Sequence, residues 1–114
     1  MGVYNFAVKR GETFDRTLIW WTVLNVTARD ITGYSFALQV RDKPGGTLLL
    51  SLATGSGITI VNGPAGQFRM VAAAATTAAL TFFKAPYDLK ATAPSGTVSY
   101  PLEGYFITDV PVTP

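Results

Sequence analysis

Cysteine and histidine are both absent from this chain of 114 residues. Without cysteine there can be no disulfide framework, no thiolate nucleophile and no thiolate metal ligand. Without histidine the chain lacks the usual acid or base near neutral pH, and also the commonest metal ligand. The missing cysteine also fits assembly in a reducing compartment.

Charge is scarce as well, because only 14% of the residues are charged, against about 25% in an average soluble domain. Nine basic and seven acidic residues leave a formal net charge of +2. That charge is too small for the positive field with which proteins attract nucleic acid, so we expect no nucleic-acid partner. Since Thr, Ser, Ala and Gly stand where charges are usual, we expect protein partners to cover part of the surface.

Long apolar runs are missing too: although 48% of the residues are hydrophobic, no run reaches the roughly 18 residues of a membrane span. Residues 1–6 lack the basic start and apolar block of a signal peptide. We therefore expect a chain made in the cytoplasm, with no membrane partner. Its length suits one domain, expected over residues 1–110, with residues 111–114 as an extended tail.

What the sequence does have is apolar and polar residues in alternation, most clearly in residues 34–52. In an extended strand this period of two places one set of side chains in the core and the other towards solvent. The expected inward set is Tyr34, Phe36, Leu38, Val40, Leu48, Leu50 and Leu52. Between the two arms, Pro44, Gly45 and Gly46 favour a turn. The pattern predicts a β-hairpin with a loop at residues 42–46.

The same alternation predicts strands at residues 3–8, 13–22, 58–61, 67–72, 86–92 and 97–108. Inward positions are expected at Phe14, Leu18 and Trp20 in one strand, and at Val98, Tyr100, Leu102, Gly104 and Phe106 in the last. Ala-rich residues 73–80 predict one or two helical turns docked through Leu80. We expect Ile31 to plug one end of the core. Seven or eight short strands separated by turns indicate an all-β sandwich or barrel.

No recognisable catalytic motif surrounds the seven carboxylates, for which turn and surface roles are expected. They are Glu12, Asp15, Asp30, Asp42, Asp88, Glu103 and Asp109. The chain has no Ser-x-x-Lys, and its Gly-rich stretches at 55–57 and 63–66 precede no helix with Lys-Ser/Thr, so we interpret them as turns. The acceptor pattern Asn25-Val26-Thr27 is interpreted as a chance match in a loop. We predict no enzyme activity, no cofactor and no metal site.

Two adjacent aromatic pairs, Trp20-Trp21 and Phe82-Phe83, are the candidate site residues. Neighbours on an extended chain point to opposite sides, so both members of a pair are buried only at a bulge, a corner or a contact. Three interpretations stay open. The outer ring is covered by a loop or the Ala-rich helix, or it anchors a protein interface, or an exposed Trp binds sugar.

Several segments together resemble a known family. They are residues 4–14, residues 30–41, Tyr87-Asp88-Leu89, and Leu102-Glu103-Gly104-Tyr105-Phe106. The resemblance is to the small Ig-like β-sandwich of tailed-phage virions, typified by the N-terminal domain of phage upper baseplate proteins. It spans nearly the whole chain.

The resemblance implies an Ig-like antiparallel β-sandwich of seven or eight strands with one short Ala-rich helix. It also implies a virion location and a structural role at the tail, baseplate or neck, through contacts with other virion proteins in symmetric copies. Capsid decoration or a collar or fibre-anchoring role is the nearest alternative. A carbohydrate-binding module is the alternative from another class.

Overall fold

The structure is a computed structural model that describes residues 2–23 and 26–113, and within them the chain forms eleven strands and one short helix. The first five strands are β1 (Gly2–Val3), β2 (Phe6–Lys9), β3 (Phe14–Ile19), β4 (Trp21–Val23) and β5 (Thr27–Ala28). The next four are β6 (Ser35–Arg41), β7 (Leu48–Thr54), β8 (Gly57–Asn62) and β9 (Gln67–Ala72). Helix α1 (Ala74–Ala78) precedes β10 (Lys84–Thr92) and β11 (Val98–Asp109). The predicted all-β class is confirmed.

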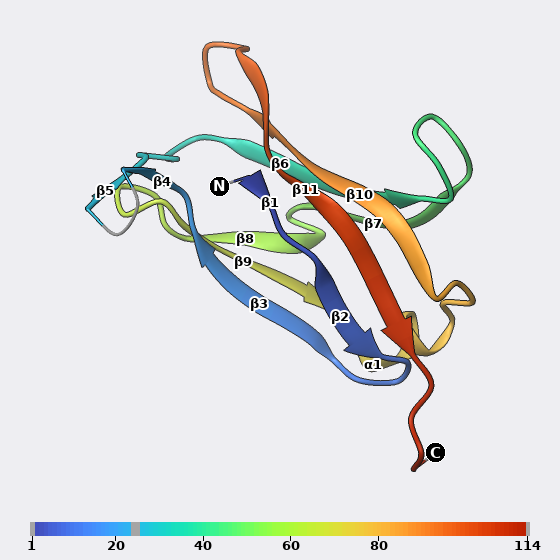
Figure 1. The fold of residues 1–114 in the computed structure, drawn as a ribbon. Helices are drawn as coiled ribbons and strands as arrows, with labels where there is room; N and C mark the ends of the chain where they lie inside the picture. The colour runs from blue at the N-terminus through green and yellow to red at the C-terminus, as the bar shows by residue number, and fades with distance from the viewer. Residues whose placement is uncertain (1, 24–25, 114) are drawn as a thin grey trace.

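Nine of these strands form one mixed sheet in the order β1-β11-β10-β6-β7-β8-β9-β3, with β2 also on β11. Both β1 and β2 pair parallel with β11, so the first and last strands lie side by side (Figure 1). Strands β7 and β8 pair in parallel over only two positions, and the sheet curls there. These parallel pairs depart from the purely antiparallel sheet that we expected.

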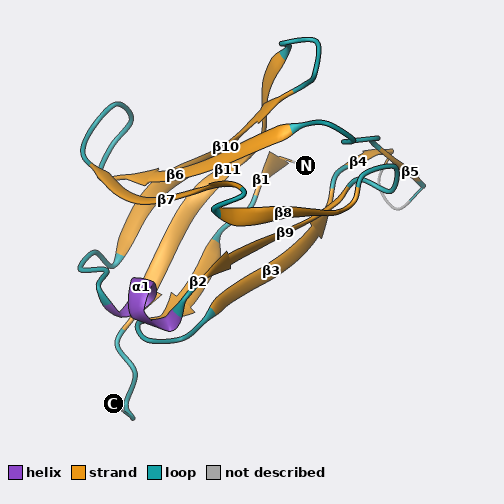
Figure 2. Cartoon of the chain, turned by 180° about the vertical axis from the view of Figure 1, so that it is seen from behind, coloured by secondary structure: helices purple, strands orange, loops and turns teal. Residues whose placement is uncertain are grey.

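The curl brings β3, β8 and β9 to face β6, β10 and β11 (Figures 1 and 2). Buried phenylalanine rings from the two halves contact one another between them. Phe36 on β6 stacks on Phe68 on β9 with ring centroids 4.8 Å apart. Phe14 on β3 lies 5.1 Å from Phe106 on β11. Ring pairs at this separation add to the free energy gained by burial, so these contacts hold the two halves together.

The predicted hairpin is confirmed as β6 and β7, with Phe36, Leu38, Val40, Leu50 and Leu52 buried. Leu48 was expected inward but is 45% exposed. The register shifts between Val40 and Arg41, where β7 has one extra residue, and such an extra residue reverses the side to which the side chains beyond it point, here Leu48. Tyr34 is only half-buried against the core.

Two of the predicted strands are interrupted, because other hydrogen bonds replace the regular backbone bonds between neighbouring strands. At residues 4–5 the Asn5 side-chain oxygen accepts the backbone N–H of Tyr105 over 2.9 Å, which separates β1 from β2. At Trp20 the backbone N–H bonds to the Gly66 oxygen over 2.9 Å, and β3 ends there. The end of the strand predicted at residues 13–22 instead lies in β4, which forms a small two-stranded sheet with β5.

The last strand corrects the expected inward set. Leu102 and Phe106 are buried, but Val98 and Tyr100 are 47% and 58% exposed. Leu89 pairs with Leu102 and Ala91 pairs with Ser99, so two residues of β11 lie opposite the single residue Lys90 of β10. This extra residue makes a β-bulge in β11. Pro101 lies in this bulge, where its missing N–H costs no ladder bond. The bulge turns Tyr100 to the outer face.

The predicted helix is confirmed as the single turn and a half of α1, and Leu80 is buried as expected. The docking contact that was not foreseen is Thr77, which is fully buried. Its hydroxyl accepts the Gly11 N–H over 3.1 Å and donates to the Glu12 oxygen over 2.7 Å. Helix α1 thus closes the turn between β2 and β3. Ile31 is fully buried, as predicted.

Candidate functional site

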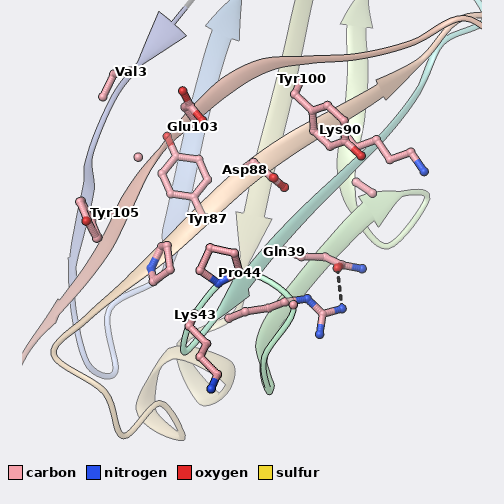
Figure 3. Close-up of a pocket in the computed structure, with 15 residues that line it drawn as sticks. Val3, Gln39, Lys43, Pro44, Tyr87, Asp88, Lys90, Tyr100, Glu103 and Tyr105 are labelled. Atoms are coloured by element: carbon pink, nitrogen blue, oxygen red, sulfur yellow. Dashed lines mark hydrogen bonds between the residues drawn. The ribbon is translucent and has the colours of Figure 1, made fainter.

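A groove of about 590 Å³ runs over the outer face of β6, β10 and β11, with β1 and the loop 42–47 at its rim (Figure 3). The strand alternation that buries Leu38, Val40 and Leu89 turns their polar neighbours outward to line it. Its lining includes Gln39, Arg41, Asp88, Lys90, Tyr100, Glu103 and Tyr105. The groove therefore combines aromatic, acidic and basic groups on rigid strands.

Two tyrosines stand at opposite ends of this groove (Figure 3). Tyr100 is 58% exposed and Tyr105 is 43% exposed. The Lys84 ammonium lies 4.3 Å from the centroid of the Tyr105 ring, a cation–π contact that fixes this ring. Along a strand five residues span about 16 Å, so the two tyrosines could contact the same extended ligand.

Two carboxylates, Asp88 and Glu103, lie between the tyrosines (Figure 3). They are directly opposite one another on β10 and β11. Partial burial and the nearby Glu103 raise the pKa of Asp88, while Arg41 acts in the opposite direction. Within residues 2–23 and 26–113, neither carboxylate forms a salt bridge. Like charges facing each other across a ladder are destabilising, so the groove carries a local electrostatic cost.

Arg41 fixes the opposite wall of the groove. Its guanidinium donates to the Gly46 oxygen over 2.7 Å. It also donates to the side-chain oxygen of Gln39 over 2.9 Å (Figure 3). Because the Gln39 oxygen accepts this bond, its NH₂ group is left to donate to a ligand. Carboxylate acceptors thus face amide and guanidinium donors across the groove.

The four residues predicted from the sequence lie outside the groove. One pair is at the start of β4 and the other follows α1, and these two elements lie at opposite ends of the molecule (Figure 2). Trp20 is buried beside Tyr34, with the Arg29 guanidinium 4.6 Å from the centroid of its indole. Trp21, expected to point outward, is half-buried on β4. The structure does not bring this pair together with the phenylalanines.

The phenylalanine pair lies beside α1. Phe82 is half-buried against Phe106, with ring centroids 6.4 Å apart, whereas Phe83 is 67% exposed. The Arg10 guanidinium donates to the Phe82 oxygen over 3.0 Å and lies 5.0 Å from the centroid of the Phe83 ring. Phe83 is therefore an exposed ring on a well-anchored backbone.

Sequence reasoning missed the groove because its residues come from three strands that are neighbours only after folding. One signal was available. A proline inside a strand usually marks an edge or a bulge, and Pro101 follows Tyr100 directly. A bulge predicted at Pro101 would have placed the Tyr100 side chain on the outer face of the sheet.

No family model matches the chain, and no curated protein is significantly similar to it. Across the described residues, no three acidic side chains gather closely enough to hold a metal ion. The described part of the chain also contains no helix long and apolar enough to cross a membrane. What the fold and the groove define is an all-β chain with a mixed-polarity face. The acceptor pattern at Asn25 lies outside the described residues.

Proposed function

We propose that this chain is an Ig-like structural component of a tailed-phage virion, placed at the tail, baseplate or neck and acting through protein contacts. In this proposal it carries no catalytic machinery and binds no cofactor. It is present in several copies, so that the symmetry of the particle multiplies weak individual contacts. Its partners are other virion proteins.

The observation that carries the proposal is the strand order. In an Ig-like sandwich one sheet holds the second, fifth and fourth strands, and the other holds the third, sixth and seventh. In this chain β2, β3, β6, β8, β9, β10 and β11 correspond to the first to seventh strands. The second, fifth and fourth, which are β3, β9 and β8, are neighbours in one half of the curled sheet, and the third, sixth and seventh, which are β6, β10 and β11, are neighbours in the other. This order supports the Ig-like architecture that the resemblance implies.

Exposed apolar groups on a sparsely charged chain support contact with other proteins. Phe83 and Tyr4 are 67% and 53% exposed. Aromatic side chains are enriched among the residues that carry most of the binding energy at interfaces. Phe83, anchored beside Arg10, is the contact residue that the proposal favours, and half-buried Trp21 is the second.

The alternatives differ in what they require of these groups. Capsid decoration or a collar or fibre-anchoring role uses the same surface at another place on the particle. A carbohydrate-binding module built on an exposed Trp is less well supported, because Trp20 is only 8% exposed and Trp21 is half-buried.

Gradient sedimentation of particles from cells that naturally make the chain tests the proposal. We expect the chain to sediment with intact particles in a constant ratio to the major structural proteins. Phe83→Ala should reduce its incorporation, whereas Val61→Ala, which shortens another exposed apolar side chain, should not. A chain found only in the soluble fraction, with no particle carrying it, would contradict the proposal.

A further inference from the structure

We propose that the groove over β6, β10 and β11 is a binding site for a short glycan. In this site Tyr100 and Tyr105 pack against sugar rings, and Asp88, Glu103 and Gln39 hydrogen-bond to hydroxyl groups. The site is separate from the protein contacts proposed above, and it uses none of the residues at the two ends of the molecule.

The exposed tyrosines are the first argument. The bulge at Pro101 turns Tyr100 outward and leaves it 58% exposed over the groove instead of in the core. Sugar rings present C–H groups on their faces, and these pack well on an aromatic ring whose hydroxyl stays in water. Tyr105 lies at the far end, with one contact to Lys84 already restricting its motion. Two such rings on one strand suit an oligosaccharide better than a single sugar.

The polar lining is the second argument. Hydroxyl groups donate and accept, so a glycan can use carboxylates and amide donors together. Asp88 and Glu103 supply acceptors, and Gln39 supplies the donor. Hydroxyl donors would also screen the repulsion between the two opposed carboxylates, because hydrogen bonds to charged acceptors are strong.

The same lining argues against other occupants. Nucleic acid needs a positive track, and the two carboxylates lie in the middle of this groove. The centre of a protein interface is depleted of charged residues, whereas charged groups line this groove from several elements. A neutral, hydroxyl-rich ligand fits the mixture of both signs.

The groove is also pre-formed, which reduces the entropy lost on binding. Arg41 is held by the Gly46 oxygen and in turn holds Gln39, and each lining strand is hydrogen-bonded to a neighbour. Replacing Tyr100 therefore changes one contact surface and leaves the fold intact, since its side chain lies outside the core.

The test uses the full chain on an array of neutral and charged oligosaccharides, followed by NMR titration of each hit with ¹⁵N-labelled protein. We expect at least one glycan to bind, with amide shifts concentrated around Gln39, Asp88 and Glu103. Tyr100→Ala should weaken binding about tenfold, and Gln39→Ala should weaken it as well. Phe83→Ala removes an exposed ring that does not line the groove and should leave the affinity unchanged.

Three outcomes would overturn the proposal. They are an array without any hit, shifts that map away from the groove, and equal affinity in Tyr100→Ala and the unsubstituted chain. Tighter binding of a lysine-rich peptide than of any glycan at the same amides would instead assign the groove to a protein partner. Circular dichroism of each variant checks that a lost affinity does not reflect a lost fold.

Discussion

At the scale of single residues, Tyr87 ties the sheet to its N-terminal edge. Its ring is buried on β10, and its hydroxyl donates to the backbone oxygen of Tyr4. Burial raises the pKa of the Tyr87 phenol, because the charged form would lose its hydration. The same group therefore links local packing to the pH dependence of stability.

Tyr87→Phe should lower the free energy of unfolding by about 1 kcal/mol at pH 7, because the Tyr4 oxygen loses its donor. The pKa is raised in the folded state, so this contribution is present below the ordinary tyrosine value of about 10 and is lost as pH rises above it. Urea titrations should therefore give a difference between the two proteins that shrinks above pH 10. Tyr100→Phe, which changes an exposed hydroxyl, is the control and should change nothing.

Asp88 provides the opposite case, in which a side chain weakens the fold. Burial and Glu103 raise the pKa of Asp88 in the folded state. Asp88 therefore costs little stability at a pH below the ordinary aspartate pKa, where it is protonated, and lowers the free energy of unfolding as pH rises and it ionises. Asp88→Asn should raise the free energy of unfolding at pH 7 by about 0.5 kcal/mol, because exposure to solvent limits the repulsion. The gain should vanish at pH 3.

Glu103→Gln checks the origin of that gain, since it removes the other member of the same pair. Each single variant should be stabilised at pH 7, and the double variant should gain less than the sum of the two. An equal effect of Asp88→Asn at pH 3 and pH 7 would show that the repulsion is not its cause.

At the scale of elements, the edge formed by β1, β2 and β11 depends on Gly104. This residue has a φ of +155° and lies against the backbone oxygen of Tyr4, at the interruption between β1 and β2. A Cβ at this position would collide with that oxygen, and backbone has little freedom to move away. The glycine therefore permits the first and last strands to meet.

Gly104→Ala should lower the free energy of unfolding by about 1–3 kcal/mol, the usual cost of an overpacked site. Gly96→Ala is a suitable control, because Gly96 also has a positive φ, +90°, but has open space around it. The free energy of unfolding of both variants is measured by denaturation. The loss in Gly96→Ala reports backbone strain alone, so the additional loss in Gly104→Ala reports the collision. Equal losses would mean that the contact with Tyr4 does not matter.

The elements also show how far sequence alone reaches. Alternation located β6, β9 and β10, because their periods run unbroken, and it located β7 from Leu50 onward. It failed where a side chain replaced a ladder bond, at Asn5, and where an extra residue reversed the parity, at Tyr100. These features depend on the partner strand, which local periodicity does not contain.

At the scale of the whole molecule, the candidate site was predictable only in part. Outward positions such as Gln39 and Asp88 follow from the alternation, but their meeting in one groove follows from the strand order. The aromatic pairs drew attention because they break the period, and the structure places them at opposite ends with very different exposure. An exposed ring on a sparsely charged chain is what a subunit of a larger assembly would present.

Electron cryomicroscopy of the native particle tests the central proposal, a structural role in a tailed-phage virion, most directly. We predict density that fits the curled sheet at a fixed position on the tail, baseplate or neck, repeated by the local symmetry, with Phe83 at a contact between chains. A complete particle map in which every density is assigned to other proteins, with this chain absent, would contradict the account.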